Sequence, residues 1–249
     1  MMKRFSSIYV PGSITSLTLQ GWVVSLAPTF PAAYDECDAA ELVGLFYETG
    51  ARAVADVATV ILEVNSSTDN FAPVYLSSCP KIREMIKKRF QHKSDLLNDA
   101  PPPAVLHARR LRQQYPGYKV LFVGPCPYKL KEAVQMGGAD MAITFSDLNI
   151  DDTCTNPKLP DTAQISSPTL RLCCLNSGIS GYQRCVSFLE DPRPIKKHYL
   201  PVEMTYCRGG CIAGDGMTSE ADRSEKQQRI INYALKLHNL QESKTHAKN

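Results

Sequence analysis

Short runs of β-branched and aromatic residues alternate with amphipathic stretches along most of the chain. Apolar runs bounded by glycine or proline predict strands over 22–28, 52–60, 73–80, 119–127, 140–148 and 198–207. Apolar residues that recur at helical spacing predict helices over 37–48, 81–91, 104–115 and 182–190. Strands that alternate with helices are typical of α/β proteins with mainly parallel sheets. We therefore expect an α/β fold.

The last part of the chain has a different pattern. After Met217, apolar residues recur at helical spacing as far as Leu240, which predicts a closing helix. Ser219 is the candidate cap of this helix, with Asp222 three residues further on. The final stretch, ESKTHAKN, has the composition of a frayed tail.

Composition excludes several classes of function. The chain has 249 residues, of which 43% are hydrophobic and 21% are charged, with a formal net charge of +3. This charge is too small to indicate nucleic-acid binding, and the basic runs 81–93 and 107–115 are typical of solvated helix faces. No apolar run reaches the roughly 18 residues that span a bilayer, and Pro11 and Gln20 interrupt any signal-peptide core. We therefore expect a cytoplasmic protein that binds neither membranes nor nucleic acid.

Nine cysteines are spread along the chain, and four of them share a pattern. Cys79, Cys126 and Cys207 each close a predicted strand, and Cys211 follows four residues after Cys207. In parallel α/β sheets, ligands collect at the carboxyl edge of the strands. Four thiolates at such an edge suit an iron–sulfur cluster or a zinc ion.

The residues beside these cysteines strengthen the pattern. Prolines flank two of the thiols and can stiffen their loops, namely Pro80, Pro125 and Pro127. Glycines surround the other two and are expected to clear space around a bulky group, namely Gly209, Gly210, Gly214 and Gly216. Taken singly, Cys79 or Cys126 is more often a small buried core residue. A pair of cysteines with three residues between them is also a weak signal of a metal site. The prediction of a metal site therefore depends on the three strand-end positions together with their proline and glycine neighbours.

The chain resembles the H-cluster domain of [FeFe]-hydrogenases, the C-terminal domain of the iron-only hydrogenase large subunit. Four stretches carry this likeness, in the order of that family: VVSLAPTFPAAY, LSSCPKI, VGPCPYKLKEA and VEMTYCRGGCIAGDG. The resemblance implies two lobes of mainly parallel sheet flanked by helices, with a metal cluster in the cleft between them. Residues 1–217 would form the H-cluster domain, with lobes at about 20–100 and 101–217. Residues 218–249 would form a C-terminal helix and a flexible tail.

The resemblance also implies a set of metal ligands. Cys79, Cys126, Cys207 and Cys211 would hold a [4Fe–4S] cubane, and Cys211 would bridge it to a two-iron subcluster. That subcluster carries carbon monoxide, cyanide and an azadithiolate, and the two parts together make up the H-cluster. The other cysteines match no ligand position and are assigned to packing, namely Cys37, Cys154, Cys173, Cys174 and Cys185.

Other positions match residues around the two-iron subcluster. Lys129 matches the family lysine that bonds a cyanide ligand, and an ammonium suits that acceptor. Ala27 and Pro28 match the Ala-Pro pair that lines the dithiolate pocket. Glu203 aligns with a family glutamate, and the alternative interpretation is that it only supports the loop. Ser78 stands in the proton-relay position, where high-turnover hydrogenases carry a cysteine.

The chain also departs from the prototypes. A thiol titrates near ~8.5, much closer to neutrality than a hydroxyl, so Ser78 predicts slower proton delivery. Gly124 and Thr205 replace methionines, which predicts a looser or more polar pocket. Only Glu63 remains in the segment where the family's proton path has its glutamates. No cysteine precedes residue 20, so electrons are expected to enter the cubane directly from a partner.

Three functions are consistent with the sequence. The first is a minimal ferredoxin hydrogenase of anaerobic hydrogen metabolism, which forms and oxidises H2 reversibly and exchanges electrons with ferredoxin or a similar carrier. The basic face at 81–93 is a candidate dock for an acidic ferredoxin, and dedicated maturation proteins would assemble the cluster. The second is an H2-sensing relative with slow turnover, which Ser78 favours. The third is a non-catalytic iron–sulfur or zinc protein.

Overall fold

The computed structural model describes residues 21–35, 39–61, 75–76, 78–148, 178–191 and 202–246. Four strands form one sheet in the order β2-β1-β4-β5. These strands are β1 (Trp22–Leu26), β2 (Ala51–Asp56), β4 (Lys119–Gly124) and β5 (Met141–Thr144). All pairings between them are parallel, so their four carboxyl ends lie at the same edge of the sheet.

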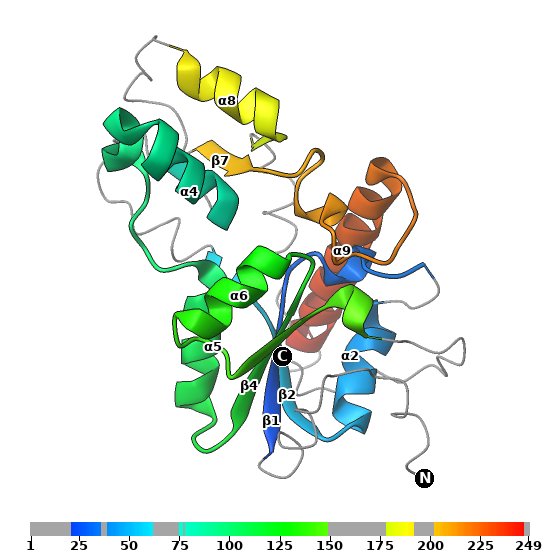
Figure 1. Ribbon diagram of the computed structural model, residues 1–249. Coiled ribbons are helices and arrows are strands. Elements are labelled where there is room, and N and C mark those ends of the chain that lie inside the picture. The colour runs from blue at the N-terminus through cyan, green and yellow to red at the C-terminus, as the bar shows by residue number, and fades with distance from the viewer. Residues whose placement is uncertain are drawn as a thin grey trace.

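Helices cover both faces of this sheet. They are α2 (Ala39–Glu48), α5 (Pro103–Gln114), α6 (Pro127–Gln135) and α9 (Arg223–His246). Figure 1 shows α5 and α6 on one side of the sheet and α2 with α9 on the other. Because both faces are covered, β1 and β4 have no exposed position, and apart from Ser25 and Lys119 their residues are apolar or glycine.

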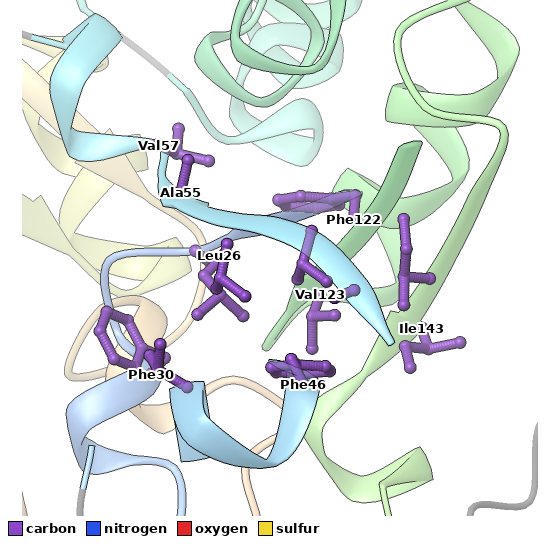
Figure 2. Packing of buried hydrophobic residues seen from close by; sticks show 14 of the residues in the cluster. Leu26, Phe30, Phe46, Ala55, Val57, Phe122, Val123 and Ile143 are labelled. Atoms are coloured by element: carbon purple, nitrogen blue, oxygen red, sulfur yellow. The ribbon is translucent and has the colours of Figure 1, made fainter. Parts of the chain in front are cut away.

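The main core lies between the sheet and these helices. Successive side chains of β4 alternate across the sheet, so that Phe122 and Val123 point to opposite sides (Figure 2). Phe46 of α2 lies on the Val123 side, where its ring packs edge to face on Trp22 at a centroid distance of 6.2 Å. Phe30, in the short 3-10 helix η1 (Phe30–Ala32), packs edge to face on Tyr233 of α9 at 5.3 Å. Aromatic contacts of this kind fix the position of α9 against the rest of the fold.

A second, smaller sheet has the order β3-β7-β6 and is also parallel. Its strands are β3 (Tyr75–Leu76), β6 (Ile179–Ser180) and β7 (Val202–Thr205). Two helices accompany it, α4 (Pro80–Arg89) and α8 (Tyr182–Glu190). In Figure 1, α4, α8 and β7 lie together, beyond the end of α6. Ile82, Ile86, Leu189 and Met204 are fully buried in the core of this unit.

Both sheets confirm the predicted α/β fold with parallel strands. The division of the chain between them is less simple than a cut at residue 100. The four-stranded sheet takes strands from both sides of that residue, and the smaller sheet joins residues 75–76 to 179–180 and 202–205. Both sheets thus combine segments from either side of residue 100, and the expected lobes at 20–100 and 101–217 stay a prediction.

Local differences from the predicted elements have clear causes. The strands are shorter than expected: β4 ends at Gly124 and β7 at Thr205, so Cys126 and Cys207 lie in the loops beyond them. Helix α6 was not predicted, because its first turn belongs to the apolar, proline-rich stretch around Cys126.

The run 107–115 is not wholly solvated, since His107 is buried and bonds Ser25 Oγ through Nδ1 at 2.7 Å. Burial lowers the pKa of His107 to about 4.

The predicted closing helix is present, but its cap differs. Asp222 Oδ1 accepts a hydrogen bond from the backbone N–H of Glu225 at 2.9 Å, whereas Ser219 Oγ donates to Asp35 at 2.6 Å. Helix α9 continues to His246, into residues where the sequence predicted a frayed tail. Among the described residues, no helix combines the length and the hydropathy of a membrane span.

Candidate metal centre

Two of the predicted ligand cysteines stand at helix N-termini. Cys79 is the N-cap residue of α4 and Cys126 is that of α6, and in each case the helix begins with a proline. A proline restricts the residue before it to extended backbone, and both cysteines have that conformation. Helix N-termini carry partial positive charge, which favours anionic groups near both cysteines. An ion pair between Arg83 of α4 and Glu132 of α6 joins the two helices close to these ends.

The other two cysteines lie in one tight loop. Cys207 follows the end of β7 by two residues, and Cys211 begins the 3-10 helix η4 (Cys211–Ala213). Between them, Gly209 and Gly210 have φ values of +93° and +85°, which residues other than glycine rarely adopt. The N–H of Gly210 donates to the carbonyl of Cys207 at 3.1 Å, which closes the turn.

All four thiols share one electrostatic neighbourhood. The pKa of the Cys207 thiol is raised to about 11, most of all by burial and then by the charges of Cys211, Cys126 and Cys79. One thiol shifts the pKa of another only when the two lie near each other. These thiols nevertheless come from the carboxyl edges of two different sheets. None of these cysteines is in a disulfide. The four cysteines that the sequence singled out therefore influence one another electrostatically, and their role as shared ligands stays a prediction.

The described side chains form no ready-made site for a single metal ion. Among the described residues, no group of three or more His, Cys, Asp and Glu side chains is arranged to hold one metal ion. A tetrahedral zinc site with Zn–S bonds of about 2.3 Å needs sulfur atoms only about 3.8 Å apart.

Lys129 lies among the thiols. Its Nζ is 3.6 Å from Cys211 Sγ and donates to Ser78 Oγ at 3.3 Å, and the side chain is partly buried. Burial by itself lowers the pKa of Lys129, but the negative charges of Cys211, Cys79, Glu203 and Cys126 raise it above its ordinary value. The ammonium thus stays charged and faces the sulfur atoms.

Ser78 and Glu203 form the adjoining part of the site. The hydroxyl and the backbone N–H of Ser78 both donate to Glu203 Oε1, at 3.0 Å and 3.1 Å. Burial raises the pKa of Glu203 to about 7, against the opposing effects of Lys129, Ser78 and Arg83. Support of the loop was one of the two interpretations of Glu203 that the sequence left open. Its bond to Ser78 spans 125 positions, so the sequence alone held no signal for it.

The Ala27–Pro28 segment lies at the carboxyl edge of the larger sheet. Ala27 N donates to Val123 O at 2.8 Å, which keeps the end of β1 beside the end of β4. A side chain at Gly124 would start only 3.2 Å from Ala27 Cβ and 3.0 Å from the Phe122 ring. The pocket is therefore not looser at this position, because neighbouring groups occupy the space. The buried hydroxyl of Thr29, next to Pro28, has no hydrogen-bond partner among the described residues and remains available to a bound group.

The glycines after Cys211 have a different role from the one expected. A Cβ atom on Gly214 would lie 2.7 Å from the carbonyl oxygen of Pro125, and one on Gly216 would lie 2.6 Å from Thr144 Cβ. The N–H of Gly216 donates to the same Pro125 oxygen at 2.9 Å. These two glycines let the cysteine loop pack onto the edge of the larger sheet. They do not clear space for a cofactor, as Gly209 and Gly210 can.

Of the other cysteines and proton-path residues named from the sequence, one cysteine packs in a core and the rest lie outside the described residues. Cys185 is fully buried in the core of the smaller unit, and its thiol donates to the carbonyls of Ile179 and Thr205. Burial raises its pKa to about 11. Four other cysteines and Glu63 lie outside the described residues, the cysteines being Cys37, Cys154, Cys173 and Cys174.

Comparison with known proteins decides the family. The chain matches the model of the family described as iron only hydrogenase large subunit, C-terminal domain, over residues 20–151. This match covers more than half of the 249 residues. The chain belongs to this family. The matched range of this hydrogenase domain includes Cys79 and Cys126, and it ends before Cys207 and Cys211.

Solved hydrogenase structures share the fold over most of the chain. A glutamate-to-alanine variant of [FeFe]-hydrogenase HydA1 from Chlamydomonas reinhardtii matches with a TM-score of 0.64 and 13% identity, covering 86% of this chain and 84% of that one. A glutamate-to-glutamine variant of HydA1 gives a TM-score of 0.63, and an apo cysteine-to-histidine variant also gives 0.63. Each of these two is 13% identical, with coverage of 90% of this chain and 86% of that one. At this identity, the likeness shows the fold alone. No curated protein sequence matches the chain.

Proposed function

We propose that this domain is a minimal [FeFe]-hydrogenase that forms and oxidises H2 reversibly at an H-cluster. The observation that carries the proposal is the position of Lys129, whose partly buried ammonium lies 3.6 Å from Cys211 Sγ within the field of three thiols and Glu203. A buried cation among sulfur atoms provides both charge and hydrogen bonds for an anionic, sulfur-rich group. Within this proposal, residues 1–217 form the H-cluster domain.

The chain's own residues would bind and orient this cofactor. Cys79, Cys126, Cys207 and Cys211 would ligate a [4Fe–4S] cubane, with Cys211 shared with the two-iron subcluster. When bound, the H-cluster supplies the redox chemistry by which two protons and two electrons become H2. Lys129 would donate a charged hydrogen bond to an acceptor beside Cys211, and so hold the cofactor in one orientation.

The Ala27–Thr29 segment would form the other wall of the site. Ala27 presents only a methyl group and Pro28 has no N–H, so both can approach a bound group without competing for its hydrogen bonds. The Thr29 hydroxyl is the one polar side-chain group of this segment, and its lack of a partner among the described residues leaves it able to donate to the cofactor. Together these residues would exclude bulk water from that side.

Electrons would enter from a ferredoxin or a similar carrier at the surface beside Cys207. Lys81 Nζ lies 4.2 Å from the centroid of the Tyr128 ring and 4.3 Å from that of Tyr206, the residue before Cys207. These cation–π contacts hold a positive charge at the surface close to the proposed cubane. The rest of the basic face is partly neutralised, because Lys88 pairs with Glu84 and Arg89 with Glu190.

Infrared spectroscopy of the matured protein tests the proposal. The chain is produced together with H-cluster maturation proteins, and H2 formation is assayed with reduced viologen. We expect infrared bands of metal-bound carbon monoxide and cyanide together with H2 formation. Cys211→Ala should lose the bands, whereas Cys185→Ala, which removes a buried thiol outside the ligand set, should keep them.

Two other outcomes would assign a different function. Bands without appreciable turnover would favour the H2-sensing relative, which the serine at position 78 supports. Iron without diatomic ligands, or zinc alone, would indicate a non-catalytic metal protein and overturn the proposal.

A further inference from the structure

Ser78 is held between a cation and a carboxylate. Lys129 Nζ donates to Ser78 Oγ at 3.3 Å, and Ser78 Oγ donates to Glu203 Oε1 at 3.0 Å. The backbone N–H of Ser78 donates to the same carboxylate oxygen at 3.1 Å, which fixes the distance between the two side chains. Lys129, Ser78 and Glu203 thus form a continuous line of hydrogen bonds that begins at Cys211 and ends in β7.

Glu203 is surrounded by groups from several elements. Lys129 faces it from α6 and Arg83 from α4, while Ser78 bonds it from the loop before α4. From α8, Cys185 directs its thiol to backbone carbonyls and not to Glu203. Burial outweighs the two cations and the hydrogen bonds, so that the pKa of Glu203 rises to about 7. A carboxyl group in this range can both take up and release protons at neutral pH.

Arg83 acts electrostatically on Glu203 and is itself partly exposed. Its guanidinium pairs with Glu132, and the two side chains are 16% and 18% exposed. The hydrogen bonds thus run from Lys129 through Ser78 to Glu203, and a partly exposed ion pair lies in the electrostatic surroundings of Glu203. Within the part of the chain that the structure describes, Glu203 is the only carboxylate that hydrogen-bonds Ser78.

We infer that Glu203 is the proton donor and acceptor of the site and acts through the hydroxyl of Ser78. This inference rests on the proposed function. In the direction of H2 formation, protonated Glu203 would give its proton to Ser78 Oγ while the hydroxyl proton of Ser78 leaves toward the site. The remaining carboxylate would take a new proton from solvent, so each relay step moves one proton inward and two relay steps supply the two protons of one H2. Oxidation of H2 runs the same steps in reverse.

The valence of the serine oxygen makes this arrangement possible. A hydroxyl has one proton to donate and two lone pairs that accept. Lys129 occupies one lone pair, and protonated Glu203 would occupy the other. The serine proton is then left to point toward the site. A hydroxyl is a poor acid by itself, so an adjoining carboxyl group that titrates near neutrality supplies what a thiol at this position would otherwise supply.

Two measurements test the inference. The first is a pH titration of the carboxyl C=O band by difference infrared spectroscopy, on protein with isotope-labelled glutamate, with and without cofactor. We expect a carboxyl group that titrates between about pH 6 and 8, absent from Glu203→Gln. The second is H2 formation by the matured protein, where Glu203→Gln should lower turnover by about 100-fold or more with unchanged carbon monoxide and cyanide bands. Glu84→Gln, an exposed glutamate of α4, should change neither measurement.

Each outcome supports or overturns the inference. It fails if no glutamate titrates in that range, or if Glu203→Gln turns over at the wild-type rate with intact bands. Loss of the bands in both Glu203→Gln and Glu203→Asp would give Glu203 a structural role and also overturn it. If the wild-type protein has no carbon monoxide or cyanide bands, the proposed function fails, and the titration still reports separately on Glu203.

Discussion

Cys79 and Cys126 occupy equivalent positions in two different units of the fold. Each is the last extended residue before a helix that begins with proline, with φ and ψ of −92° and 113° for Cys79 and −134° and 113° for Cys126. The two helices are linked by the Arg83–Glu132 ion pair. One local arrangement, a Cys-Pro dipeptide at a helix start, therefore presents two thiols to one space from two separate sheets.

Removal of either thiol should prevent cluster assembly without unfolding the protein. Cys79→Ala and Cys126→Ala leave the helix-starting prolines in place, so we expect folded protein that retains little iron after anaerobic reconstitution. The wild-type chain should hold about four iron atoms per cubane under the same conditions. Iron content and circular dichroism measure the two effects.

Cys185→Ala is the matched control for these variants. Cys185 is also buried, but it bonds backbone carbonyls in the smaller core. Its replacement should lower the free energy of unfolding by about 1 kcal/mol and leave the iron content unchanged. Equal iron loss in all three variants would contradict the assignment of Cys79 and Cys126 as ligands.

The backbone conformation of the turn between Cys207 and Cys211 should matter for cluster binding, in addition to any effect on the free energy of unfolding. A Cβ atom added to Gly210, at φ +85°, would lie 3.9 Å from its nearest neighbour, and one added to Gly117, at φ +84°, would meet nothing within 4 Å. Alanine has room at both sites but is strained in this backbone region, at a cost of about 1–2 kcal/mol. Gly210→Ala and Gly117→Ala should therefore lose similar free energies of unfolding.

Only the variant in the cysteine turn should lose iron. Relief of strain at residue 210 would shift Cys207 and Cys211 relative to each other, whereas residue 117 lies in the turn between α5 and β4. Urea denaturation and iron content, measured on both variants, separate the two effects. Equal iron content in both would show that the turn geometry does not matter for the cluster.

A negative carrier should use the basic face of α4. The triple variant Lys87→Glu, Lys88→Glu and Arg89→Glu should raise KM for an acidic ferredoxin several-fold at low salt, with viologen-driven turnover unchanged. The difference should shrink near 1 M salt, where the Debye length is about 3 Å. Arg109→Glu on α5 is the control and should leave KM unchanged. An unaltered KM in the triple variant would rule out this docking face.

The sequence contained the cysteine motifs and the α/β pattern because both are local. Cys79 and Cys126 could be found from their proline neighbours, and the strands before them from their apolar runs. Contacts between residues far apart in the chain produce no recognisable pattern in the sequence. Ser78 meets Glu203 across 125 positions, and Gly216 packs on Thr144 through an approach that only the folded chain reveals. The expected role of the glycines therefore suits the pair inside the cysteine turn and is wrong for the pair after it.

Asp35 connects the segment that carries Ala27 and Pro28 to the C-terminal part of the chain. Its carboxylate accepts hydrogen bonds from Ser219 Oγ at 2.6 Å, from Glu220 N at 2.9 Å and from Arg229 Nη1 at 2.7 Å. The Ser219 bond is the largest of the effects that lower the pKa of Asp35 to about 2. The side chain is 32% exposed, so solvent screens part of this interaction.

The stabilising effect of Asp35 should depend on pH in a defined window. Because the folded-state pKa lies below the ordinary value of 3.8, the stabilisation is present above about pH 4 and is lost as the pH falls toward 2. Asp35→Asn should therefore lower the free energy of unfolding by about 1 kcal/mol at pH 7 and by almost nothing at pH 2. Urea denaturation at the two pH values measures this, with Asp99→Asn, an exposed aspartate far along the chain, as the control. A loss of equal size at both pH values would mean that Asp35 acts through its shape and not through its charge.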